Sequence, residues 1–166
     1  LQFLFDLIGL PFLPTYTDYQ LKYKIDFDKK NQLTFIGIGA IDDSELNLTI
    51  DNPSESQNFI LSYLPEYHQW NYTVGAVYKH FADQYFDTWV LSRNMFRNGS
   101  YKFQNNDDNL PKTSDYLSDE IENKFRFERS YPSAPIKVLW GGGVKYAKYT
   151  NETYRKVFFN NMVNEL

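Results

Sequence analysis

The sequence predicts an all-β protein, a long antiparallel up-and-down meander that forms part of a transmembrane β-barrel. Three observations predict this fold. Apolar and polar residues alternate with a period of two, the alternating segments are long, and short turns alternate with long polar loops. The composition agrees, because 19% of the 166 residues are aromatic, there is no cysteine, and the net charge is -4. These values exclude a disordered chain and a disulfide scaffold, and they argue against a nucleic-acid-binding protein.

The most regular alternation runs from Tyr19 to Phe27, where every odd position is apolar and every even position is polar. A period of two places these two sets on opposite faces of a β-strand. Comparable patterns predict six strands, over residues 15–27, 32–42, 69–81, 85–97, 116–129 and 136–149. Two of them are less regular, because 32–42 is apolar on both faces and 85–97 mixes large apolar with charged residues. For 85–97 the pattern indicates either a bulge or a different face.

The predicted strands are about 11 to 14 residues long, whereas strands of globular proteins commonly have about 5 or 6. At about 3.3 Å per residue, a strand of about 13 residues spans roughly 43 Å. A tilt of about 45° reduces this length to a height of about 30 Å, which matches the hydrocarbon core of a bilayer. Strand length therefore favours a membrane-spanning sheet over a soluble one.

The predicted connections differ in length at the two ends of the strands. Short turns at 28–31, 82–84 and 130–135 alternate with long polar loops at 43–68 and 98–115. This arrangement is typical of outer-membrane barrels, whose short turns lie on the periplasmic side. Aromatic residues near the strand ends predict girdles at the two membrane surfaces, although aromatic pairs across a soluble sheet are an alternative interpretation.

We divide the chain into three parts. Residues 1–14 are a lead-in segment, residues 15–149 hold the six strands with their turns and loops, and residues 150–166 start a further loop or strand. The chain begins with Leu1 rather than Met, and we interpret it as a piece of a longer protein.

Eight stretches resemble the barrel of TonB-dependent outer-membrane receptors, in the form common in Bacteroidetes. They are Leu10–Pro14, Tyr19–Lys22, Phe35–Asp42, Gln69–Gly75, Tyr78–Phe81, Leu91–Asn94, Glu120–Glu128 and Tyr146–Tyr149. The resemblance covers nearly the whole chain and thins after about residue 150. These stretches are strand framework rather than catalytic signatures, so they are silent about the substrate.

The resemblance implies a barrel of about 22 strands with a plug domain inside it, in the outer membrane of a Gram-negative bacterium. It also implies uptake of a nutrient, such as a siderophore, a vitamin, an oligosaccharide or a peptide, driven through the partner protein TonB. The chain departs from the complete family pattern, because it has no plug, no visible TonB-contacting segment and no aromatic C-terminal strand. We therefore expect an internal segment of the barrel wall, which cannot close a barrel by itself.

In such a wall, one face of each strand contacts lipid and the other faces the plug or a hydrated lumen. We expect lipid contact for Leu21, Tyr23, Ile25, Trp70, Val74, Phe125, Phe127, Val138 and Trp140. We expect a luminal or plug-facing position for Lys22, Lys24, Asp26, Glu122, Lys124, Arg126, Lys137 and Lys145. The alternation of acidic and basic residues in 120–128 predicts salt bridges on that polar face rather than a catalytic acid and base.

No motif predicts an enzyme, a cofactor or a firm metal site. His68 and His80 are the only histidines, and neither has the i, i+4 partner of a helical zinc motif. Asp107 and Asp108 are weak calcium candidates, because their run of oxygen-bearing residues lacks the glycine and distal glutamate of an EF-hand. The glycines in 141–143 complete no phosphate-binding motif and predict strand curvature or close packing of a plug against the wall.

Two other functions fit parts of this pattern. A small soluble barrel of about eight strands would bind an apolar ligand as a lipocalin does, with its apolar residues pointing inward. An outer-membrane barrel enzyme such as a lipase would need a serine, a histidine and a carboxylate at one rim, and only His68 or His80 could serve.

Overall fold

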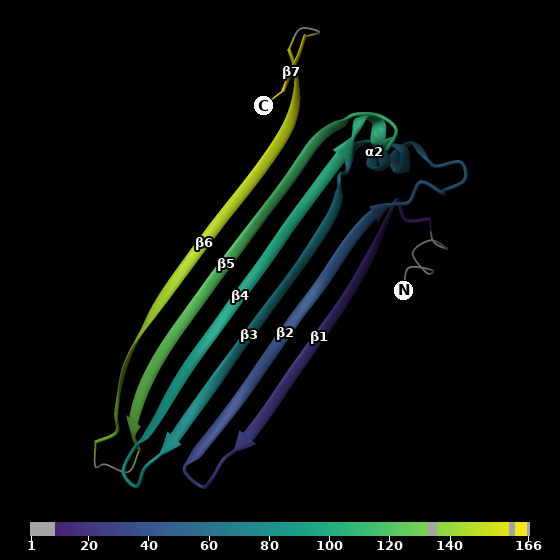
Figure 1. The fold of residues 1–166 in the computed structure, drawn as a ribbon. Coiled ribbons are helices and arrows are strands. Elements are labelled where there is room, and N and C mark those ends of the chain that lie inside the picture. Colours follow the sequence, from purple (N-terminus) through teal and green to yellow (C-terminus); the bar gives the residue numbers. More distant parts are fainter. Residues whose placement is uncertain (1–8, 133–135, 160–161, 166) are drawn as a thin grey trace.

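The computed structural model describes residues 9–132, 136–159 and 162–165. In this part of the chain, seven antiparallel strands form one sheet in sequence order (Figure 1). The elements are β1 (Phe12–Asp26), β2 (Asn31–Leu46), α2 (Glu55–Tyr63), β3 (Glu66–Phe81), β4 (Phe86–Phe103), η1 (Gln104–Asn106), β5 (Lys112–Tyr131), β6 (Val138–Phe159) and β7 (Met162–Glu165). The predicted all-β, antiparallel up-and-down meander is confirmed. Residues 1–8 of the predicted lead-in segment lie outside the described residues.

The six long strands exceed their predicted lengths and contain 15 to 22 residues. β4 continues to Phe103 instead of ending at 97, and β6 runs to Phe159 instead of 149. The additional residues lie at the loop end of the strands, where both faces are mostly polar. The alternation that marks a strand disappears there, while the backbone ladder continues.

The helix α2 lies within the predicted long loop 43–68, and sequence reasoning did not anticipate it. Its start is a capping box: the backbone N–H of Gln57 donates to the Ser54 hydroxyl (3.3 Å), and the backbone N–H of Ser54 donates to the Gln57 side chain (2.8 Å). The helix ends at Leu64, whose extended backbone is the conformation that the following Pro65 favours. The Ser54-x-x-Gln57 spacing was the available sequence signal.

The register of the two irregular strands is regular in the structure. β2 pairs with β1 and β3 without interruption. β4 pairs continuously with β3 from Phe86 to Tyr101 and with β5 from Phe86 to Lys102. The register shift in β4 falls between Lys102 and Phe103, so no bulge explains the charged residues of 85–97. Those charges occupy positions on the same face as the large apolar residues.

The three short turns are staggered along the sheet. The ladders end at Asp26↔Gln32, Phe81↔Phe86 and Tyr131↔Val138. The register relates these three ends to one another. The β3–β4 ladder extends two residue pairs farther in the direction of the turns than the β1–β2 ladder, and the β5–β6 ladder extends one pair farther than the β3–β4 ladder. A stagger of about 10 Å over four strand spacings of about 19 Å inclines the strands by roughly 30° if the turns lie at one level.

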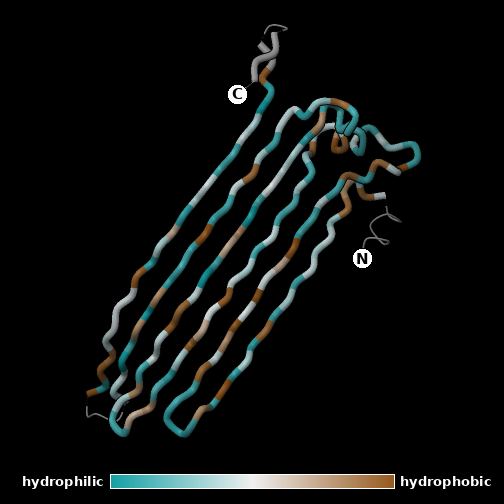
Figure 2. The backbone as a smooth tube through the Cα atoms, in the orientation of Figure 1, coloured by the Kyte–Doolittle hydropathy of each residue, from teal (hydrophilic) through white to brown (hydrophobic). Residues whose placement is uncertain are grey.

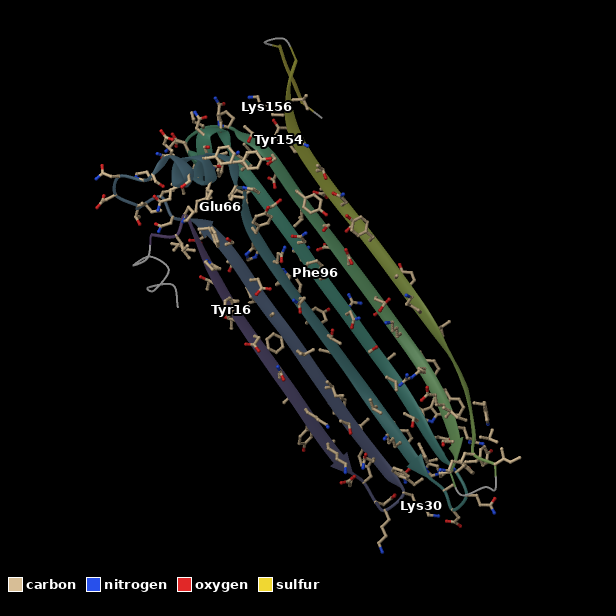
Figure 3. The ribbon with its side chains drawn as sticks, turned by 180° about the vertical axis from the view of Figure 1, so that it is seen from behind. Tyr16, Lys30, Glu66, Phe96, Tyr154 and Lys156 are labelled. Atoms are coloured by element: carbon tan, nitrogen blue, oxygen red, sulfur yellow. The ribbon has the colours of Figure 1, made fainter. Side chains whose placement is uncertain are left out.

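The sheet is a single layer without a hydrophobic core. Among the described hydrophobic residues, Leu46 alone is buried. Side chains project from both faces with no second layer over them, from Lys30 at the turn end to Glu66 at the loop end (Figure 3). Hydrophobic residues lie along the middle of the strands, and hydrophilic residues dominate the turns and upper loops (Figure 2). Because burial of apolar surface drives folding, this sheet needs another medium or molecule to cover one of its faces.

Candidate functional site

The strand register sorts the side chains into two faces, which we call the apolar face and the polar face. One row of the apolar face holds Tyr23, Phe35, Ala76, Leu91, Phe125 and Val144. The adjacent row of the polar face holds Lys24, Thr34, Val77, Val90, Arg126 and Gly143. Each row crosses all strands from β1 to β6.

The residues for which we predicted lipid contact all lie on the apolar face: Leu21, Tyr23, Ile25, Trp70, Val74, Phe125, Phe127, Val138 and Trp140. The residues for which we predicted a luminal position lie on the polar face, with one exception: Lys22, Lys24, Asp26, Glu122, Lys124, Arg126 and Lys145. The exception, Lys137, precedes β6 and has no position in the ladder. The ladder therefore places the two sets on opposite faces of the sheet, and the medium that contacts each face stays a prediction.

Four charged residues and a histidine bound the apolar face on the loop side. The boundary is formed by Asp43 on β2, His68 on β3, Arg97 on β4, Asp119 on β5 and Lys148 on β6. Asp43 and His68 lie in one row of the ladder. Arg97 and Asp119 share a row that is two pairs closer to the turns, and Lys148 lies in a row two pairs closer again. This slope has the same direction and nearly the same size as the stagger of the turns.

Polar residues also bound the apolar face on the turn side, where Asn31, His80, Asp87 and Arg129 share one row. The Asn31 side chain accepts from the Tyr78 hydroxyl (2.6 Å) and lies 2.9 Å from His80 Nδ1. Arg129 donates from Nε and Nη2 to the two Asp87 oxygens (2.7 and 2.8 Å). These contacts link neighbouring strands just above the turns.

We call the part of the apolar face between these two boundaries the apolar band. On β4 its bounding charges are Asp87 and Arg97, and on β5 they are Arg129 and Asp119, ten positions apart in each strand. Ten positions extend about 33 Å, which an inclination of roughly 30° reduces to about 29 Å. This height resembles the apolar band of about 25 Å in outer-membrane barrels and a hydrocarbon core of about 30 Å.

Aromatic rings cluster in the part of the apolar band that is nearest to the turns. The Trp89 ring lies 4.3 Å from Phe127 and 6.0 Å from Phe125, and Phe127 meets Trp140 edge to face at 5.5 Å. The Arg129 guanidinium lies 4.1 Å from the ring centroid of Tyr85 and 5.8 Å from that of Trp140. The cluster combines apolar rings with a charged edge, as is typical of a boundary between an apolar and an aqueous medium.

The polar face carries the ion pairs predicted within 120–128. Glu122 accepts from Lys124 (2.5 Å) and from Lys145 of the next strand (3.0 Å), and Arg126 lies 3.6 Å from Glu128. All of these side chains are accessible to solvent, so each pair adds at most about 1 kcal/mol. These ion pairs therefore lie on a surface that is open to solvent.

Two glycines of β6 allow a close approach of the neighbouring strand. A Cβ on Gly141 would overlap the Phe127 carbonyl and lie 2.9 Å from the Glu128 Cα. A Cβ on Gly143 would lie 2.6 Å from the Phe125 carbonyl, whereas Gly142 has nothing within 4 Å. Gly141 and Gly143 therefore allow close packing against β5, a role that the sequence analysis did not assign to them. The two predicted roles, strand curvature and packing of a plug against the wall, stay predictions.

The two long loops contact each other at the end of the sheet opposite the turns. The Asn106 side-chain amide donates to the backbone carbonyls of Leu61 and Leu64, the latter at 3.2 Å. Lys102 donates to the Tyr63 carbonyl (3.0 Å), and its ammonium lies 5.5 Å from the Tyr63 ring centroid. These bonds join α2 to the loop that contains η1. We call these two joined loops, residues 47–65 and 104–111, the rim.

The calcium candidates bond to a neighbouring amide. Asp107 accepts from the Asn109 side chain (2.9 Å) and from the Asn109 backbone N–H (3.0 Å), and these bonds hold the pKa of Asp107 below its usual value. Asp108 accepts from the same side chain at 3.0 Å. No group of three or more histidine, aspartate or glutamate side chains converges on a metal position in the part of the chain that the structure describes.

Sequence reasoning missed the arginines that face the apolar side. Arg97 donates from Nε and Nη2 to the Asp119 carboxylate (2.6 and 2.7 Å). Arg93 donates from Nε to the Tyr72 hydroxyl (3.0 Å) and from Nη1 to Asn123 Oδ1 (3.1 Å). The sequence signal for these arginines was the presence of charged residues at positions of 85–97 that should be apolar. Only the partners on the neighbouring strands show what each arginine binds.

Among the residues that the structure describes, no helix has the length and apolar character needed to cross a bilayer. No protein-family model, curated protein or solved structure matches this chain.

Proposed function

We propose that this chain supplies part of the wall of an outer-membrane β-barrel receptor that imports a nutrient with energy delivered through TonB. The observation that carries the proposal is the apolar band, whose loop-side boundary runs nearly parallel to the staggered turns. Between its two boundaries the band is twelve positions long on β2 and β3 and ten on β4 and β5. At an inclination of roughly 30° these lengths correspond to heights of about 34 Å and about 29 Å, and a hydrocarbon core of about 30 Å requires a lipid-facing surface of similar height.

The energetics of the two faces support this assignment. A large apolar side chain that stays in water forgoes about 1.5–3 kcal/mol of burial energy. Trp89, Leu91 and Val144 are among many such side chains on the apolar face, and they are 41%, 62% and 70% exposed. Hydrocarbon would cover all of them at once, while the ion-paired polar face would meet water or a hydrated plug.

The open edges of the sheet support a large barrel. β1 and β7 are the two ends of the described sheet, and neither pairs with the other. A long strand with an unpaired edge is stable in a membrane only if further strands pair with it, because bare backbone polar groups are costly in hydrocarbon. We therefore propose that additional strands complete the wall, as in receptors of about 22 strands.

Import through TonB rests on the sequence resemblance, and the structure adds the rim formed by the two long loops. Substrate contacts in such a receptor belong to the rim and the plug, so the described wall leaves the choice among siderophore, vitamin, oligosaccharide and peptide open.

Spin labelling of two neighbouring residues tests the wall assignment directly. The chain has no cysteine, so Phe125→Cys and Arg126→Cys each accept a single nitroxide label. In protein reconstituted into bilayers, we expect the label at position 125 to collide with molecular oxygen and the label at 126 with a water-soluble nickel chelate. Leu91→Cys and Ser92→Cys provide a matched pair on β4. Equal accessibility to the nickel chelate at 125 and 126 would overturn the proposal.

A further inference from the structure

Arg93 is the one charged side chain inside the apolar band among the residues that the structure describes. It lies on β4 between Val74 of β3 and Asn123 of β5, four positions closer to the turns than the bounding Arg97. Three other arginines of β4 and β5 meet a carboxylate, in the pairs Arg97–Asp119, Arg126–Glu128 and Arg129–Asp87. No carboxylate of the described residues forms an ion pair with Arg93.

Arg93, Tyr72 and Asn123 form a cluster whose remaining polar hydrogens are available as hydrogen-bond donors. A guanidinium group can only donate, so Asn123 presents its oxygen to Arg93 and its amide NH₂ group is directed elsewhere. The Tyr72 hydroxyl oxygen likewise accepts from Arg93 and keeps its own hydrogen for donation. Together with the remaining N–H groups of Arg93, these donors and the positive charge match an anion.

A shallow hollow of about 630 Å³ opens beside this cluster. Its apolar lining comes mainly from Leu21, Phe35, Gly37, Val74, Ala76 and Leu91. The small residues Gly37 and Ala76 leave space in two successive rows, while larger side chains border it. Because neighbouring strands lie about 4.8 Å apart, the apolar lining from the four strands β1 to β4 gives a trough roughly 14 Å long. Arg93 of β4 and Asn123 of the fifth strand, β5, lie at one end of it.

We propose that this hollow binds a long-chain carboxylate, with its head on Arg93 and Asn123 and its hydrocarbon chain along the trough. The guanidinium fork matches a carboxylate in geometry as well as charge. A phospholipid headgroup is a poorer match, because Arg93 lies about 13 Å along the strand from the bounding Arg97, and a glycerol with two chains would have to descend with the phosphate. The inference rests on the proposed function, since the carboxylate reaches this face from the bilayer.

The test measures binding of carboxyl-¹³C-labelled hexadecanoate to the purified protein in neutral detergent micelles by NMR. We expect saturable binding with an affinity that falls about tenfold or more in Arg93→Gln, since a hydrogen bond to a charged group is lost. Arg126→Gln removes an arginine from the polar face and should leave the affinity unchanged. Hexadecanol, acetate and phosphatidic acid are the competitors, and each should compete at least about tenfold less well than unlabelled hexadecanoate.

Asn123→Asp separates binding from a purely structural role of Arg93. The new carboxylate would pair with Arg93 inside the sheet, so the variant should unfold at the same temperature as the wild type or higher. The same pair would occupy the guanidinium and repel the ligand, so hexadecanoate binding should be lost. If Arg93 serves only to tie three strands together, Asn123→Asp would bind hexadecanoate as the wild type does, and the inference would be overturned. This comparison also decides the matter if Arg93→Gln does not fold.

Three further results would overturn the inference: equal competition by hexadecanol, equal competition by phosphatidic acid, or an unchanged affinity in folded Arg93→Gln. The failure of this inference is distinguishable from failure of the wall assignment. If the spin label at position 125 contacts lipid and hexadecanoate binding does not depend on Arg93, the carboxylate site is refuted and the wall assignment stands. Labels that report water, combined with binding that needs Arg93, would keep the site and remove the wall.

Discussion

Gly39 lies directly opposite Tyr19 in the ladder, and the tyrosine ring covers the space that a side chain at position 39 would need. A Cβ there would also lie 2.7 Å from the backbone oxygen of Asn71 on the other neighbouring strand. Gly37, two residues earlier on the same face, has only the Leu21 Cβ near that position, at 3.8 Å. An aromatic ring that packs over a glycine on the adjacent strand fixes the pairing register, and this role belongs to Gly39 alone of the two.

Gly39→Ala should therefore destabilise the sheet, while Gly37→Ala should not. The Tyr19 ring can rotate away, but the Asn71 carbonyl is part of the backbone and must shift. We expect the free energy of unfolding to fall by about 1–3 kcal/mol in Gly39→Ala. Gly37→Ala should be neutral or stabilise by up to about 1 kcal/mol, because alanine loses less chain entropy on folding. Urea unfolding followed by tryptophan fluorescence checks both, and equal losses would contradict the packing argument.

At the scale of elements, the rim is held together by side chains that reach from one loop to the other. Asn106 bonds to the last turn of α2, and Lys102 bonds to the carbonyl of Tyr63 at its end. The helix has its own capping box, yet nine residues are too few for a helix to persist in water alone. Contacts with the other loop therefore supply much of its stability.

The variant Asn106→Gly tests this contact, with Asn105→Gly as its matched control. Both asparagines have positive φ values, 55° and 56°, so glycine relieves the same backbone cost at each position. The hydrogen bonds to α2 come from the Asn106 side chain. Loss of these bonds should cost about 1 kcal/mol or more, so hydrogen exchange in residues 55–63 should accelerate at least about fivefold in Asn106→Gly. Equal exchange in the two variants would show that the helix does not depend on this contact.

For the whole molecule, the important property is the difference between the two faces. The ladder places Phe125 in the apolar band and its chain neighbour Arg126 on the polar face. The long strands, the inclined turns and the single layer all follow from one requirement, namely that apolar side chains stay between two polar boundaries. The described residues cannot meet that requirement by folding onto themselves, because they form no second layer.

In the proposed wall, Phe125 contacts lipid and Arg126 does not, so Phe125→Arg should impair assembly into the outer membrane, whereas Arg126→Gln should not. A charge in the middle of a lipid-facing surface costs about 2–4 kcal/mol. Loss of the exposed Arg126–Glu128 pair costs at most about 1 kcal/mol. The folded yield in outer-membrane fractions, measured by heat-modifiable migration on gels, checks the prediction. Comparable yields of the two variants would refute the assignment of the faces.

The sequence by itself determined the six long strands and, in four of them, which residues share a face, because a period of two depends on neighbours in the chain. It also contained the capping box at Ser54, which is a local signal for the start of a helix. Tertiary structure decided what depends on neighbours across the sheet: the stagger of the turns, the pairing of Arg97 with Asp119, and the difference between Gly37 and Gly39. The physical reason is that a strand leaves half of its hydrogen bonds and most of its packing to other strands, whose register no local pattern specifies.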